Sequence, residues 1–131
     1  MKHPSSKTAF FLYCLLIALI ILLADLDKLP GSLFMKIPHY DWLAHFLLYG
    51  FFYRLLDSAL KEREILLFKR PGSPALCISS AFIILEEISQ LFLSSRTFSL
   101  MDLFMGFLGI GVFMKFRVSV PSETKILSDQ G

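Results

Sequence analysis

The chain has 131 residues, of which 55% are hydrophobic and 18% charged, and its formal net charge is +2. This composition excludes a disordered chain, which would have few apolar residues and a large net charge. A net charge this small also gives no sign of the basic surface that binds nucleic acid. In a soluble domain about a quarter of the residues are charged, more than in this chain, so the composition indicates a membrane protein. The length is enough for one domain, and we expect residues 1–131 to form a single integral membrane domain.

Four apolar runs predict four transmembrane helices, over residues 8–24, 42–60, 75–93 and 98–116. The first run carries no charge. As a helix with a rise of about 1.5 Å per residue it would be about 25 Å long, and together with its flanking residues it is long enough to cross a bilayer. A signal peptide is the alternative for this run, but no Ala-x-Ala cleavage site follows it, which favours a retained helix. Residues 117–131 are expected to form a flexible tail.

A soluble bundle of buried helices is the competing fold. It would need a polar face on each helix, and the run 8–24 has none. A helix that is apolar all round is buried in protein or lies in lipid. The predicted fold class is therefore an all-α membrane protein, a bundle of about four transmembrane helices.

The basic residues predict the orientation of this bundle. Ten of the thirteen lie at the termini or around the loop after the second helix, and three lie in the other two loops. By the positive-inside rule both termini are cytoplasmic, and the loops 25–41 and 94–100 face outward. The expected location is the cytoplasmic (inner) membrane of a bacterium, with the chain crossing it several times.

The second predicted helix carries three polar residues on one face. Asp41, His45 and Tyr49 follow one another at intervals of four, so their side chains lie one above another. A single histidine inside a membrane often forms only a hydrogen bond between helices. For a single residue the structural role is favoured, and a site is favoured only for the whole set of polar residues at one depth.

The third predicted helix carries Glu86, Glu87 and Gln90, and Gln90 lies within a turn of both glutamates. We expect Glu87 to be the functional member of the pair. Glu86 is expected to be structural, protonated or paired elsewhere.

The fourth predicted helix begins with Asp102, and Gly106 and Gly109 follow on the same face. Small residues there allow a neighbouring helix to approach closely. Arg96 is the only cation of the preceding loop, so we predict an ion pair between Arg96 and Asp102. Such a pair would close the loop over the cluster, or would only lock the bundle together.

The ionisable residues of three helices fall at a similar depth, about 5–9 Å below the outer surface at about 1.5 Å per residue. A charge at the bilayer centre costs about 2.5–3.5 kcal/mol on insertion scales, and less near the interface. The least costly arrangement is convergence on one polar cluster. Its expected members are Asp41, His45, Glu86 or Glu87, Gln90, Arg96 and Asp102.

Two blocks of this pattern resemble the VanZ-like family of small bacterial membrane proteins. The first reads Asp41-x-x-x-His45-x-x-x-Tyr49, and the second has Glu87, Gln90, Arg96 and Asp102 at the family spacing, followed by Gly109. Where the family usually has Asn four residues after this aspartate, the chain has Gly106. The resemblance implies a multi-pass inner-membrane protein with its polar cluster near the outer face. The family's namesake is linked to low-level teicoplanin resistance, so an antibiotic-resistance role is expected.

The expected function is an action on the cell envelope, in which the protein binds or modifies a lipid-linked or surface component. The catalytic candidates are His45, Glu87 and Asp102, and the substrate-binding candidates are Asp41, Tyr49, Gln90 and Arg96. His45 would serve as general acid or base, and the guanidinium of Arg96 would bind a phosphate or carboxylate. Whether the chain is an enzyme stays open.

Two other functions remain. One is a non-catalytic membrane partner whose polar residues only hold the bundle together, and the other is a small proton-linked transporter, which would need a homo-oligomer. The expected partners are membrane lipids and a lipid-linked envelope substrate, with no nucleic acid. No cofactor and no metal site are expected, because His45 is the single good nitrogen ligand, and Cys14 and Cys77 lie in apolar runs.

Overall fold

The computed structural model describes residues 5–26, 28, 38–60, 65–67, 70–94 and 96–116. Its helices are α1 (Ser6–Asp25), α3 (Tyr40–Ala59), α4 (Pro74–Ser89), the short 3-10 helix η1 (Gln90–Phe92) and α5 (Leu100–Lys115). Between α3 and α4, β1 (Ile65–Leu67) and β2 (Arg70–Gly72) pair antiparallel, with Ile65 opposite Gly72.

The four predicted helices are confirmed, with bounds that differ by at most two residues except at the end of the third. There the α-helix stops at Ser89 and tightens into η1, whereas the prediction continued to residue 93. The small hairpin was not predicted. The predicted tail, 117–131, lies outside the described residues, as does most of the first loop.

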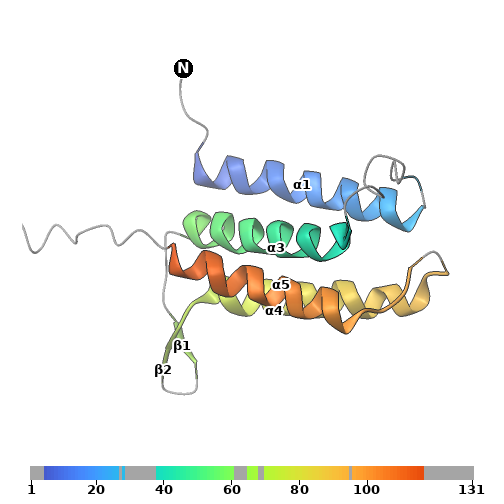
Figure 1. The fold of residues 1–131 in the computed structure, drawn as a ribbon. Helices are drawn as coiled ribbons and strands as arrows, with labels where there is room; N and C mark the ends of the chain where they lie inside the picture. The colour runs from blue at the N-terminus through green and yellow to red at the C-terminus, as the bar shows by residue number, and fades with distance from the viewer. Residues whose placement is uncertain are drawn as a thin grey trace, which may run out of the picture.

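The four long helices run alternately up and down, side by side (Figure 1). The start of α1, the end of α3, the hairpin and the end of α5 lie at one end of the bundle. The opposite end collects the end of α1, the start of α3, the end of α4 with η1, and the start of α5. Residues far apart in the sequence therefore meet at this second end.

Three helices begin at a serine that caps them. The hydroxyls of Ser5, Ser73 and Ser99 accept hydrogen bonds from backbone N–H groups three residues on, at 3.2–3.4 Å. Each satisfies one of the N–H groups that a helix start leaves without a partner. Pro74 follows Ser73 in the first turn of α4, where a proline costs no hydrogen bond.

Helices α3 and α5 form the closest contact of the bundle. Gly109 lies directly against the backbone carbonyl of Phe46, so that a Cβ atom there would collide with it. At Gly106 a Cβ atom would lie 3.0 Å from the ring of Tyr49. The prediction that these two glycines allow a close helix approach is confirmed.

Helix α1 lies more loosely on the rest of the bundle. The hydroxyl of Tyr13 donates a hydrogen bond to the carbonyl of Leu48 at 2.9 Å, and the rings of Phe10 and Phe52 are 5.5 Å apart. Ile17 is the one buried residue of this helix. Most of the apolar surface of α1 is consequently unpaired with protein.

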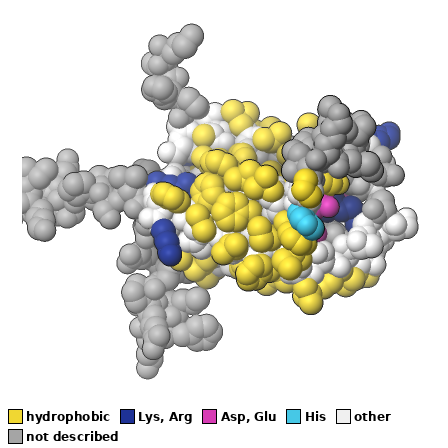
Figure 2. All heavy atoms as spheres, viewed as in Figure 1, with side chains coloured by type: hydrophobic (Ala, Val, Ile, Leu, Met, Phe, Trp, Pro, Cys, Tyr) yellow, Lys and Arg dark blue, Asp and Glu magenta, His cyan; other side chains and the backbone are white. Residues whose placement is uncertain are grey.

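The exterior of the bundle is largely apolar. Figure 2 shows hydrophobic side chains over the middle of one face, with basic groups at one end and acidic, histidine and basic groups at the other. In the described part of the chain, two helical segments are long and apolar enough to cross a membrane, Ser6–Asp25 and Pro74–Phe92. Helix α5 is apolar but has 16 residues, and α3 carries charges near both ends.

Candidate functional site

Polar side chains gather at the end of the bundle where α1 and α4 finish and α3 and α5 begin. Each helix contributes to this end, since the up-and-down order brings two helix ends and two helix starts together. We use the name polar cluster for the side chains that the structure brings together here, namely His45, Tyr49, Glu86, Glu87, Gln90 and Arg96.

Glu86 is the centre of the hydrogen bonding. One of its oxygens accepts from the hydroxyl of Tyr49 at 3.0 Å, and the other accepts from the side-chain amide of Gln90 at 2.9 Å. The guanidinium of Arg96 lies 3.9 Å from that second oxygen. The sequence left open whether Glu86 or Glu87 faces the cluster, and the structure brings both into it, because α4 packs against both α3 and α5 and so buries two consecutive residues.

Glu87 is 1% exposed and belongs to the same cluster. Its Oε1 accepts a hydrogen bond from the backbone N–H of Ser99, at 2.6 Å, which joins the end of α4 to the cap of α5. Its Oε2 is buried and has no hydrogen-bond partner among the described residues. A buried carboxylate oxygen without a partner is costly, so this atom needs an explanation.

His45 is fixed by the first turn of its own helix. Its Nδ1 lies 2.8 Å from the backbone carbonyl of Asp41. A carbonyl can only accept, so Nδ1 carries the proton, and in the neutral ring Nε2 keeps its lone pair. Asp41 thus orients the imidazole through its backbone, while Asp41 itself is an exposed residue, which differs from the prediction that its carboxylate joins the cluster.

Arg96 does not pair with Asp102 in the described part of the structure, so that prediction is wrong. Its guanidinium lies 3.9 Å from Asp25 at the end of α1 and 3.9 Å from Glu86. Asp102 lies instead in the first turn of α5, where the helix dipole favours a carboxylate. The backbone N–H of Asp102 is capped by Ser99, and its Oδ1 is buried without a hydrogen-bond partner among the described residues.

Sequence reasoning missed the roles of Asp25 and Ser99. Asp25 was assigned only to the first loop, although it ends the long uncharged run on the same predicted side of the membrane as Arg96. The predicted location of Asp25 and Arg96 on the same side of the membrane could have indicated that they form an ion pair. The backbone contact of Ser99 with Glu87 carries no sequence signal.

The charges of the described residues at this end are unbalanced. Arg96 is the one Lys or Arg that forms a described ion pair here, against the carboxylates of Asp25, Glu86, Glu87 and Asp102. Two of those carboxylates already face the guanidinium. Direct binding of a phosphate or carboxylate by Arg96 would therefore bring a further negative charge into a site that already has an excess.

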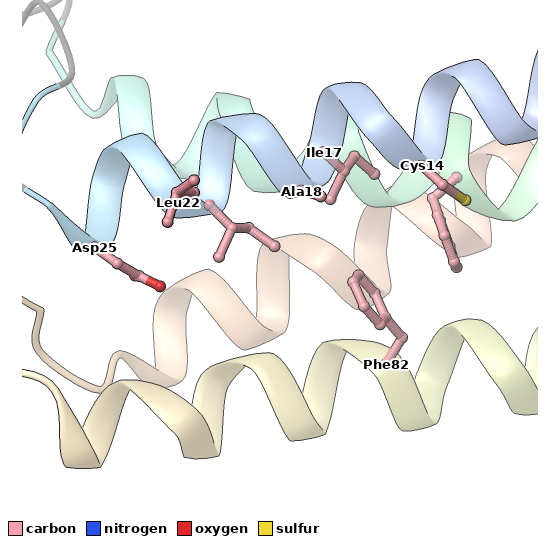
Figure 3. A pocket seen from close by; sticks show the side chains of 8 residues that line it. Cys14, Ile17, Ala18, Leu22, Asp25 and Phe82 are labelled. Carbon is pink, nitrogen blue, oxygen red and sulfur yellow. The ribbon is translucent and has the colours of Figure 1, made fainter.

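An apolar groove of about 480 Å³ leads to the same end of the molecule (Figure 3). Helix α1 forms one side of the groove from Cys14 to Asp25, and Phe52 of α3 and Phe82 of α4 form the other. Asp25 lies at the end of the groove and contacts Arg96. The groove and the polar cluster are thus adjacent.

The other end of the bundle carries a smaller polar contact. Asp57, 1% exposed, accepts a hydrogen bond from Ser73 at 3.3 Å and lies 3.8 Å from Arg54. Ser73 also caps α4, so this contact joins the end of α3 to the start of α4. Its role is structural.

Comparison of the chain with protein-family models, with curated proteins and with solved structures finds no match.

Proposed function

We propose that the chain is a VanZ-like integral membrane protein that binds a lipid-linked component of the cell envelope at the outer face of the cytoplasmic membrane. The observation that carries this proposal is the apolar groove, which ends at Asp25 next to the polar cluster. A ligand that suits both parts has a long apolar chain and a polar head.

All four long helices cross the bilayer in this proposal. The apolar exterior of the bundle supports it, because so much exposed hydrophobic surface is rare on a soluble monomer. The basic residues at the end opposite the polar cluster, among them Lys7, Arg54 and Lys115, support a cytoplasmic location of that end. The polar cluster then lies under the outer surface.

The hydrocarbon chain of the ligand lies in the groove, beside Ile17, Ala18 and Ile21. Its polar head reaches the cluster, where carboxylate oxygens accept hydrogen bonds from hydroxyl or amide groups. The bonds from Tyr49 and Gln90 hold Glu86 in position for this task. A lipid whose head carries hydroxyl or amide groups and no negative charge combines such a chain with such a head.

A reaction at this site would use His45. Its protonated Nδ1 is held by the carbonyl of Asp41, so Nε2 is the atom available to accept a proton. Glu87 lies in the same cluster and would stabilise the imidazolium that forms. Binding without reaction uses the same contacts, and the binding proposal does not depend on catalysis.

The test is mass spectrometry of the lipids that co-purify with the protein in a mild detergent. Wild type should retain a lipid species enriched over the bulk membrane lipids. Ala18→Trp, which fills the groove, should lose that species, whereas Leu19→Trp, on a neighbouring residue outside the groove lining, should retain it. Equal lipid profiles for all three proteins, or no enrichment in wild type, would contradict the proposal and favour a purely structural cluster.

A further inference from the structure

We infer that His45, Glu86 and Glu87 form a binding site for a divalent transition-metal ion of the Zn²⁺ type. This inference goes beyond the proposed function and does not depend on it, since metal binding is measured on the purified protein alone. With an ion bound, Nε2 of His45 ligates the ion, so the proton-accepting role of His45 given above applies only to the metal-free protein. It replaces the expectation that the chain has no metal site.

The first observation is geometric. One potential ligand atom from each of the three residues lies within 4.8 Å of the other two. All three residues are buried, at 9%, 8% and 1% exposure for His45, Glu86 and Glu87. They come from two packed helices, α3 and α4, which hold the backbone positions fixed.

The second observation is the state of the imidazole. Nδ1 of His45 donates to the carbonyl of Asp41, so the lone pair of Nε2 is free for a metal. Histidine ligands of metals almost always donate their other ring N–H to a carbonyl or carboxylate, which fixes the tautomer and the ring orientation.

The third observation is the unsatisfied oxygen of Glu87. Oε2 of this side chain is buried and has no hydrogen-bond partner in the described part of the chain, although Oε1 has a short bond to Ser99. Because a lone carboxylate oxygen buried in this way is expensive, the atom points to a ligand that would sit beside it. A cation is the ligand that suits it, since the surrounding carboxylates outnumber the single arginine.

The donor set selects the metal. One imidazole nitrogen and two carboxylate oxygens suit Zn²⁺ or Mn²⁺, and catalytic zinc sites often have three protein ligands and one open position. Ligands about 2.1 Å from a tetrahedral zinc ion lie roughly 3.4 Å apart. The ligand atoms, which lie within 4.8 Å of one another, must therefore move closer by up to about 1.4 Å when the ion binds. The open position would take water or a polar atom of a ligand.

The test is a titration of metal-free, detergent-purified protein with ZnCl₂ at pH 7 by isothermal calorimetry. We expect one ion per chain, and a loss of affinity on the order of 100-fold or more for Glu87→Gln and for His45→Gln. His39→Asn is the matched control, because His39 is an exposed histidine at the start of the same helix and Asn tolerates its left-handed backbone (φ 58°). This control should bind zinc as wild type does.

A second variant guards against a loss of binding through misfolding. His45→Cys replaces one zinc ligand by another, so it should bind one ion, and X-ray absorption at the zinc edge should show one sulfur ligand at about 2.3 Å. Wild type should show nitrogen and oxygen ligands alone. Stoichiometric binding that survives Glu87→Gln, binding that disappears only with His39→Asn, or no binding to folded wild type would each overturn the inference.

Discussion

Gly109→Ala should lower the free energy of unfolding by about 3 kcal/mol, the largest effect that we expect from adding a single carbon atom to this chain. The Cβ atom would meet the backbone carbonyl of Phe46 on α3, and a backbone group cannot turn away as a flexible side chain can. The helices α3 and α5 would have to separate, and their contact is the most extensive in the bundle.

The matched control is Gly111→Ala on the same helix. A Cβ atom at position 111 has nothing within 4 Å, so this variant should be as stable as wild type or slightly more stable, because alanine favours a helix. The measurement is thermal unfolding of the detergent-purified proteins, followed by circular dichroism. Equal stability of the two variants would show that α3 and α5 do not pack as described.

Arg96→Ala should destabilise the protein by about 2 kcal/mol, less than a fully buried pair loses when one member is removed. Its guanidinium faces both Asp25 and Glu86, and the Glu86 side chain is 6% exposed. Removing Arg96 leaves these carboxylates without their cation. About a fifth of the Arg96 side chain is exposed, which keeps the cost below that of a fully buried pair.

Glu86→Gln in the same chain supplies the internal control. If Arg96 acts mainly by compensating Glu86, the loss in the double variant should be smaller than the sum of the two single losses. The unfolding measurements should be made with a chelator present, so that metal binding does not enter them. Strictly additive losses would show that Arg96 and Glu86 do not act as a pair.

The helices could be predicted because the physical constraint is simple. Runs such as residues 8–24 carry no charge, and long apolar runs form helices whose backbone groups are satisfied internally. The sequence also predicted that His45, Glu87 and Gln90 gather at one end, because these residues lie at similar distances from the ends of their predicted helices.

The partners of individual side chains could not be predicted. Arg96 was expected to pair with Asp102, its nearest carboxylate further along the chain, but the end of α1 brings Asp25 within 3.9 Å. That approach depends on how α1 lies on the other helices, which local sequence does not encode. Similarly, Glu87 was preferred over Glu86 because Glu87 and Gln90 match the family spacing. Adjacent residues of a helix point about 100° apart, and only packing on two sides of α4 buries both glutamates.

The hairpin was missed for a different reason. Its second strand, Arg70–Gly72, contains a proline and a glycine, which normally argue against a strand. A two-stranded hairpin has only edge strands, where a proline is tolerated because one side of each strand needs no partner.

We propose that the chain crosses the membrane with its polar cluster beneath the outer surface. Cysteine accessibility tests it directly, in a background where Cys14→Ala and Cys77→Ala remove the native thiols. Ser94→Cys lies in an exposed turn at the cluster end, and Lys115→Cys lies at the exposed end of α5, on the opposite side of the bundle. A membrane-impermeant maleimide should label position 94 in intact spheroplasts and position 115 only after the membrane is permeabilised. The reverse pattern, or equal labelling of both positions before permeabilisation, would contradict the account.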